Sequence, residues 1–138
     1  MRTAIYLGFT VAALGIATSA MAQDAFLGKP EYDQRCAVCH GAEGAGDGAV
    51  GALFAQAPRD LRTLAAQNGG VFPFADVYQA IEGRREIAAH GGSEMPIWGD
   101  YLLAEALERR NVSPYDAQLV VEARIIALTQ YISSLQTP

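Results

Sequence analysis

Apolar residues recur at helical spacing in several segments of this 138-residue chain, and no segment alternates as a strand would. The clearest segment follows Ser113, a good N-cap residue, and has Pro114 at the first helical position, so it predicts a helix over 114–135. Its inward-facing positions are predicted to be Val120, Val121, Arg124, Ile125, Leu128, Tyr131, Ile132 and Leu135.

Shorter patterns predict four further helices, over residues 27–39, 60–68, 73–82 and 100–110. Asp60 and Asp100 are expected to cap the second and the fourth of these, and Gly69-Gly70 to stop the second. The face of the third is predicted to carry Phe74, Val77, Tyr78 and Ile81. The sequence therefore predicts an all-α domain of about four to five helices.

Two segments between these helices predict loops. Residues 41–57 consist mainly of Gly, Ala and small acids, which cannot form a core of their own and suggest a loop wrapped on something from outside the chain. Residues 83–99 have glycines at both ends, one proline and no sustained period, which indicates an extended functional loop.

The first 22 residues predict a secretory signal peptide. Arg2 precedes an apolar run, and Ala20 and Ala22 form a small-x-small cleavage site before Gln23. Cleavage leaves residues 23–138 as one exported domain with no stable membrane insertion. The alternative is an uncleaved anchor, because the apolar run from Ala4 to Ala22 is nearly long enough to span a bilayer.

Charge limits the partners of this domain. The formal net charge is −5, and it becomes −6 when Arg2 is removed, because residues 1–22 contain no acid. A nucleic-acid surface needs clustered positive charge, so no nucleic-acid partner is expected.

The stretch RCAVCHGAEGAGDGAVG at 35–51 holds both cysteines, Cys36 and Cys39, and one of two histidines, His40. A disulfide between the cysteines would close a loop too short to stabilise the fold much. The motif Gly46-x-Gly48-x-x-Gly51 is a weak candidate for dinucleotide binding, because a helix and not a strand is predicted before it.

Three chemistries remain for Cys36-x-x-Cys39-His40. A thioredoxin-like dithiol would need the cysteines at a helix N-terminus, whereas they are predicted at a C-terminal end. A structural zinc site needs four ligands, and only His90 and carboxylates are left to complete one. A covalent haem uses all three residues, two thiols for the vinyl groups and the imidazole for the iron, and export favours it.

With these residues in place, the chain resembles the class I c-type cytochromes, in particular their small bacterial periplasmic monohaem members. Besides CAVCH, the similarity includes APRDL at 57–61, EMPIWG at 94–99 and the residues Gly28, Tyr32, Leu128 and Tyr131. It implies a cytochrome c fold in which the N- and C-terminal helices cross through those four residues. It also implies one haem c attached through Cys36 and Cys39, with His40 as proximal ligand.

The sixth iron ligand is expected to be Met95. It is the only methionine of residues 23–138, and Pro96 favours an extended backbone before it, so the thioether can project from the chain. The resemblance names the same residue. His90, five residues earlier, is the alternative ligand.

The resemblance implies further contacts around the haem. The carbonyl of Pro58 is expected to accept a hydrogen bond from His40, and Trp98 to pack over the haem edge. Arg59, Arg84 and Arg85 are candidate partners of the haem propionates. Residues 100–113 are an extra segment relative to simpler members of the family, and they bear on which partner the protein recognises.

Filled axial positions imply an electron carrier and not an enzyme, because a substrate would have to displace a ligand. The expected function is periplasmic electron transfer by a monomer between redox proteins, such as a membrane complex or dehydrogenase and an oxidase or reductase. Two alternatives remain: a haem-bearing subunit of a larger dehydrogenase or oxidase complex, and a gas sensor or enzyme with a labile sixth ligand.

Overall fold

The computed structural model describes residues 27–54, 56–84, 95–109 and 112–137, and helices and turns make up these ranges. After a first helix at 27–35, the elements are α2 (Ala37–His40), α3 (Leu64–Gln67), α4 (Phe74–Glu82), α5 (Trp98–Leu107) and α6 (Pro114–Ser134), with short 3-10 turns η1 (Gly51–Leu53) and η2 (Leu61–Thr63). No strand occurs in the described ranges, which agrees with the predicted all-α class. The predicted signal peptide, Arg85 and His90 lie outside them.

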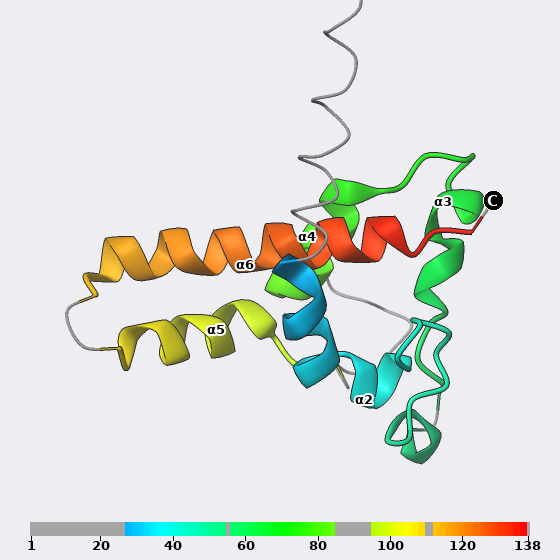
Figure 1. Cartoon of the computed structure of the whole chain (residues 1–138), viewed down its shortest axis with the longest axis horizontal. Coiled ribbons are helices and arrows are strands. Elements are labelled where there is room, and N and C mark those ends of the chain that lie inside the picture. The colour runs from blue at the N-terminus through cyan, green and yellow to red at the C-terminus, as the bar shows by residue number, and fades with distance from the viewer. Residues whose placement is uncertain (1–26, 55, 85–94, 110–111, 138) are drawn as a thin grey trace, which may run out of the picture.

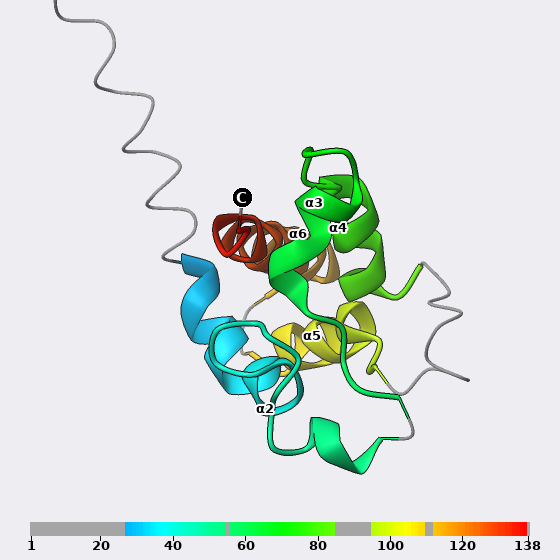
Figure 2. The same cartoon turned by 90° about the vertical axis from the view of Figure 1, so that its right-hand side faces the viewer.

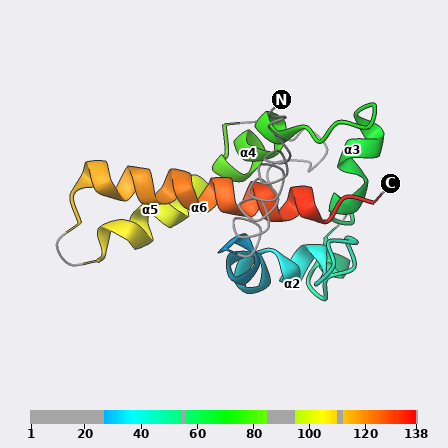
Figure 3. The same ribbon diagram turned by 45° about the horizontal axis from the view of Figure 1, so that its top comes forward.

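Helix α6 is the centre of the fold (Figure 1). The side chain of Ser113 accepts a hydrogen bond from the backbone N–H of Asp116 at 3.1 Å, and Pro114 opens the helix, as the sequence predicts. The first helix and α2 lie on one side of α6, and α4 packs on the other (Figure 3). The predicted inward face is confirmed except at Val120, whose side chain is 38% exposed because it lies on the outer side.

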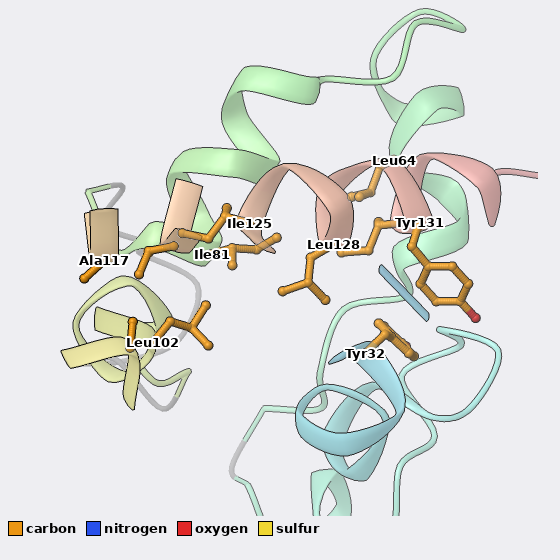
Figure 4. Close-up of a cluster of buried hydrophobic side chains, with 11 residues drawn as sticks. Tyr32, Leu64, Ile81, Leu102, Ala117, Ile125, Leu128 and Tyr131 are labelled. Carbon is orange, nitrogen blue, oxygen red and sulfur yellow. The ribbon is translucent and has the colours of Figure 1, made fainter. Parts of the chain in front are cut away.

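The core lies along α6 and is apolar apart from Thr129. From α6 it takes Ala117, Val121, Ile125, Leu128, Tyr131 and Ile132, which meet Tyr32, Leu64, Ile81, Leu102 and Ala106 (Figure 4). The hydroxyl of Thr129 donates to the carbonyl of Ile125 at 2.8 Å, so the one buried polar side chain of this core is satisfied within its own helix.

The first helix crosses α6 at a glycine. A Cβ atom built on Gly28 would lie 2.0 Å from the carbonyl oxygen of Ala127 and 2.8 Å from the Cβ of Tyr131, so only glycine lets the two backbones approach this closely. Next to this contact, the rings of Tyr32 and Tyr131 pack with centroids 5.1 Å apart. The predicted crossing of the N- and C-terminal helices through these residues is confirmed.

The region predicted as a helix at 60–68 begins as the turn η2 and continues as α3. Asp60 is its N-cap, as predicted, because its carboxylate accepts from the backbone N–H of Arg62 at 2.9 Å. The backbone N–H of Gly70 bonds to the carbonyl of Ala65 at 2.8 Å, which ends the helix as the glycine pair predicts. Helix α4 runs from Phe74 to Glu82 and is capped by Gly83, whose φ of 98° suits glycine.

Helix α5 begins at Trp98, two residues before the predicted start at 100. Its N-cap is Ile97, and Asp100 lies in the first turn, so the prediction that Asp100 caps the helix is wrong. The extra segment thus forms a helix that packs antiparallel to α6 as one arm of a hairpin (Figures 1 and 2). None of the helices in the described ranges has both the length and the apolar character needed to cross a membrane.

Candidate functional site

The sequence Cys-x-x-Cys-His lies at the junction of the first helix and α2. The structure breaks the single helix predicted at 27–39, because residue 36 forms a turn with φ −100° and α2 starts at Ala37. Hydrogen bonding still runs through the break: the N–H of Cys36 bonds to the carbonyl of Tyr32, and that of His40 to the carbonyl of Cys36, both at 2.8 Å. Cys36 and His40 therefore remain one helical turn apart.

The glycine-rich segment after His40 folds back onto α2. The N–H of Gly46 bonds to the carbonyl of His40 at 2.8 Å, and the N–H of Gly48 bonds to that of Cys39 at 3.1 Å. A Cβ on Gly48 would lie 2.4 Å from the carbonyl carbon of Cys39, which explains why glycine is needed there. The glycines of this loop approach the backbone of α2, and wrapping of the loop on a group from outside the chain stays a prediction.

The core also reaches this loop. The hydroxyl of Tyr32, fully buried beside α6, donates to the carbonyl of Gly41 at 2.8 Å. Burial raises the pKa of the Tyr32 phenol well above its usual value, so the hydroxyl keeps its proton and remains a donor. The helix crossing and the loop that follows His40 are therefore connected through one side chain.

The ring of His40 is oriented by a backbone carbonyl. Its Nδ1 lies 3.1 Å from the carbonyl oxygen of Arg59, and since a carbonyl can only accept, this hydrogen bond places the proton on Nδ1. In the neutral ring, Nε2 then carries the lone pair that can bind a metal ion. The prediction that Pro58 supplies this carbonyl is wrong by one residue, because the Pro58 carbonyl is turned toward Gly46, whose Cβ would lie 2.4 Å from it.

One pocket brings together most of the residues that the sequence singles out. It is lined mainly by apolar atoms, and Cys36, Cys39, His40, Pro58, Met95 and Trp98 all contribute to it. Met95 comes 55 residues after His40 in the sequence, and the packing of α5 against the rest of the molecule places it there. The structure thus joins the two cysteines, the imidazole and the thioether in one place.

Three further lining residues were missed from the sequence: Arg35, Phe54 and Gln56. Arg35 directly precedes Cys36, and Phe54 is the one aromatic residue of the segment 41–57, so the sequence position of each could have suggested a place in the pocket. Gln56 carried no such signal.

Two of the predicted basic residues do not line this pocket. Arg59 bonds through its guanidinium to the side-chain oxygen of Gln67. Arg84 is 70% exposed and pairs with Glu82, with its Nη2 2.6 Å from Oε1, beside a different hollow between α4, α5 and α6. Of the cations in the described ranges, Arg35 is the one that lines the pocket.

The cysteines are two free thiols in an apolar setting. Burial, with a smaller effect from the nearby charge of Glu31, raises the pKa of the Cys36 thiol to about 12. A redox dithiol of the thioredoxin kind works through a thiol with a lowered pKa, so this environment opposes that alternative. In the part of the chain that the structure describes, no three His, Cys, Asp or Glu side chains lie close enough to hold a metal ion together.

The donor set of the pocket fits a haem. Cys36 and Cys39 would attach the two vinyl groups of a haem, the imidazole of His40 would bind its iron, and the thioether of Met95 would be a second iron ligand. Aromatic and apolar side chains, including Trp98 and Phe54, form the walls. Comparison of the chain with models of protein families, with curated proteins and with solved structures found no match.

Proposed function

We propose that this protein is an exported electron carrier with one haem c, held through thioethers at Cys36 and Cys39 and ligated by His40 and Met95. The observation that carries the proposal is the convergence of these four side chains on one pocket from two segments far apart in the sequence. Bound there, a haem would supply a single-electron couple on its iron.

The residues of the chain have separate tasks in this proposal. The Arg59 carbonyl holds the His40 ring, so Nε2 points away from the hydrogen bond. As an iron ligand, the thioether of Met95 would favour the reduced state relative to a second imidazole and so raise the reduction potential. Trp98 and Phe54 line the pocket and would shield a bound haem from water, which would limit reorganisation of solvent when its charge changes.

The test of covalent attachment uses the protein exported from a bacterium able to attach haem. The wild type should stain for haem on a denaturing gel, and the double variant Cys36→Ala, Cys39→Ala should not. A double variant that still stains would refute thioether attachment. Loss of residues 1–22 from the exported protein, measured by mass spectrometry, tests the predicted signal peptide and the periplasmic location.

Spectra and binding of carbon monoxide test whether the sixth position of the iron is filled, as the proposed electron carrier requires. A filled sixth site predicts a low-spin oxidised spectrum with the weak long-wavelength band of an iron–sulfur bond, and poor binding of carbon monoxide by the reduced protein. Rapid carbon monoxide binding and a high-spin spectrum would instead favour the gas sensor or enzyme with a labile ligand.

A second candidate function is that of a haem-bearing subunit in a larger dehydrogenase or oxidase complex. The hairpin of α5 and α6 favours it, because large apolar side chains there are open to solvent: Leu107 is 46% exposed, Tyr115 74% and Leu119 47%. Purification from the source membrane and periplasmic fractions decides between the two. A free carrier elutes alone, whereas a subunit elutes with its complex in constant proportion.

A further inference from the structure

Four charged side chains form a connected cluster beside the pocket. Arg124 of α6 donates to Glu31 of the first helix at 2.7 and 3.1 Å and to Glu105 of α5 at 3.2 Å. Arg35 donates to Glu31 and, through Nη2, to the same oxygen of Glu105 at 2.7 Å. Two acids and two bases from three helices thus share five hydrogen bonds.

The cluster is largely shielded from water. The side chains of Glu31, Arg35 and Arg124 are 15–18% exposed, and that of Glu105 is 34% exposed. Burial alone would raise the pKa of Glu31, but the hydrogen bonds from Arg124 and Arg35 outweigh it and the pKa is lowered. Shielded pairs of this kind interact more strongly than exposed ones, and loss of one member leaves its partner uncompensated.

Arg35 extends the cluster into the pocket. Its guanidinium carbon lies 5.1 Å from the centre of the Tyr101 ring and 6.0 Å from that of Trp98, both in the first turn of α5, and the two rings meet edge to face. Arg35 also lines the pocket and directly precedes Cys36. The contact between Arg35 and these two rings therefore links the end of the first helix to the start of α5.

That start determines where Met95 lies. Helix α5 begins three residues after Met95, so a shift of α5 away from the first helix would move Met95 with it. Glu105 is the member of the cluster that ties α5 to both arginines. Among the described residues, Asp100 in the first turn of α5 and Glu108 at its C-cap take no part in this cluster.

We infer that Glu105 is a positioning residue for the sixth ligand: by holding Arg35 and Arg124, it keeps α5, and with it Met95, closed over the pocket. The inference rests on the proposed function, since it concerns the stability of the bond between Met95 and the iron. Without the Glu105 carboxylate, α5 and Met95 move away from the pocket more often, and an added ligand binds at the sixth position of the iron more readily.

The experiment is a titration of the oxidised holoprotein with imidazole, which competes with Met95 and abolishes the weak iron–sulfur band. Glu105→Gln keeps the size of the side chain and removes its charge. We expect the apparent Kd for imidazole to fall about tenfold, since coupling within such networks commonly amounts to about 0.5–3 kcal/mol and a tenfold change corresponds to about 1.4 kcal/mol. The matched control is Glu108→Gln, an exposed acid at the end of the same helix, which should leave the Kd unchanged.

A second measurement reports on the helix directly. Amide hydrogen exchange over residues 98–107 should be faster in Glu105→Gln than in the wild type or in Glu108→Gln. If Glu105→Gln does not accumulate, Glu105→Asp, which keeps the charge on a shorter side chain, should show a smaller change in the same direction.

The outcomes separate the inference from the proposed function. Haem staining and the iron–sulfur band of the wild type test the function, and their absence overturns both. If both are present, an imidazole Kd in Glu105→Gln within about twofold of the wild type, or an equal change in Glu108→Gln, overturns the positioning role alone. A loss of global stability with no change in Kd also overturns it, because that result describes a purely structural contact.

Discussion

Replacement of Gly28 by alanine tests the helix crossing most directly. The new Cβ would lie 2.0 Å from the carbonyl oxygen of Ala127 and 2.6 Å from its carbon, where ordinary contacts begin at about 3.4 Å. Both neighbours are backbone atoms of α6, so no side chain can rotate to relieve the contact. The first helix has to move away from α6 by more than 1 Å.

The size of the effect follows from what this movement disturbs. Overpacking a close contact costs roughly 1–3 kcal/mol. Separation of the Tyr32 and Tyr131 rings costs about 0.5–1.5 kcal/mol, and loss of the Tyr32 hydrogen bond to Gly41 about 1 kcal/mol. Alanine returns about 1 kcal/mol through its higher helix propensity. We expect a net loss of roughly 2–4 kcal/mol in the free energy of unfolding.

The assay is urea unfolding of the exported holoprotein, followed by circular dichroism. Gln34→Ala, an exposed substitution in the same helix, is the control and should change stability by less than about 0.5 kcal/mol. A Gly28→Ala protein as stable as the wild type would mean that the two helices do not approach each other at this point, and the reasoning would be refuted.

Three further predictions concern single side chains. Met95→His should keep a six-coordinate iron and lower the reduction potential, since imidazole stabilises the oxidised iron more than a thioether does, and potentiometry that finds no lowering would contradict the ligand assignment. Tyr32→Phe should cost about 1 kcal/mol in urea unfolding, because it removes the donor to the Gly41 carbonyl; no loss would show that this hydrogen bond is not formed. The pKa of Glu31 in the folded protein is lowered from 4.5, so its contribution to stability is present above about pH 4.5 and is lost as the pH falls through the folded value. In urea unfolding between about pH 5 and 3, Glu31→Gln should therefore lose less stability than the wild type. An equal loss in both proteins would show that Glu31 is not stabilised by its arginines.

Much of the fold is local and could be predicted from the sequence. Ser113 and Pro114 define the start of α6 whatever packs against it, because capping needs only the backbone of the next turn. The spacing of Leu128, Tyr131 and Ile132 likewise fixes the buried face of α6. The motif Cys36-x-x-Cys39-His40 predicts which residues would hold the proposed haem, since it depends on residue type and spacing alone.

Other features depend on atoms far apart in the sequence. The carbonyl that faces His40 belongs to Arg59 and not to Pro58, because the backbone of residues 57–61 packs against Gly46 through the Pro58 carbonyl. No local sequence pattern predicts this contact. The start of α5 at Trp98 follows from packing on α6, which allows helical turns before the residue that the capping rule selects. The cation at the pocket is Arg35 and not Arg59 or Arg84, because only the tertiary fold brings Glu31, Glu105 and two aromatic rings around one guanidinium. The sequence by itself thus determined most of the helices and singled out the residues of the proposed haem site, while the positions of charges and carbonyls around that site were decided by contacts between helices.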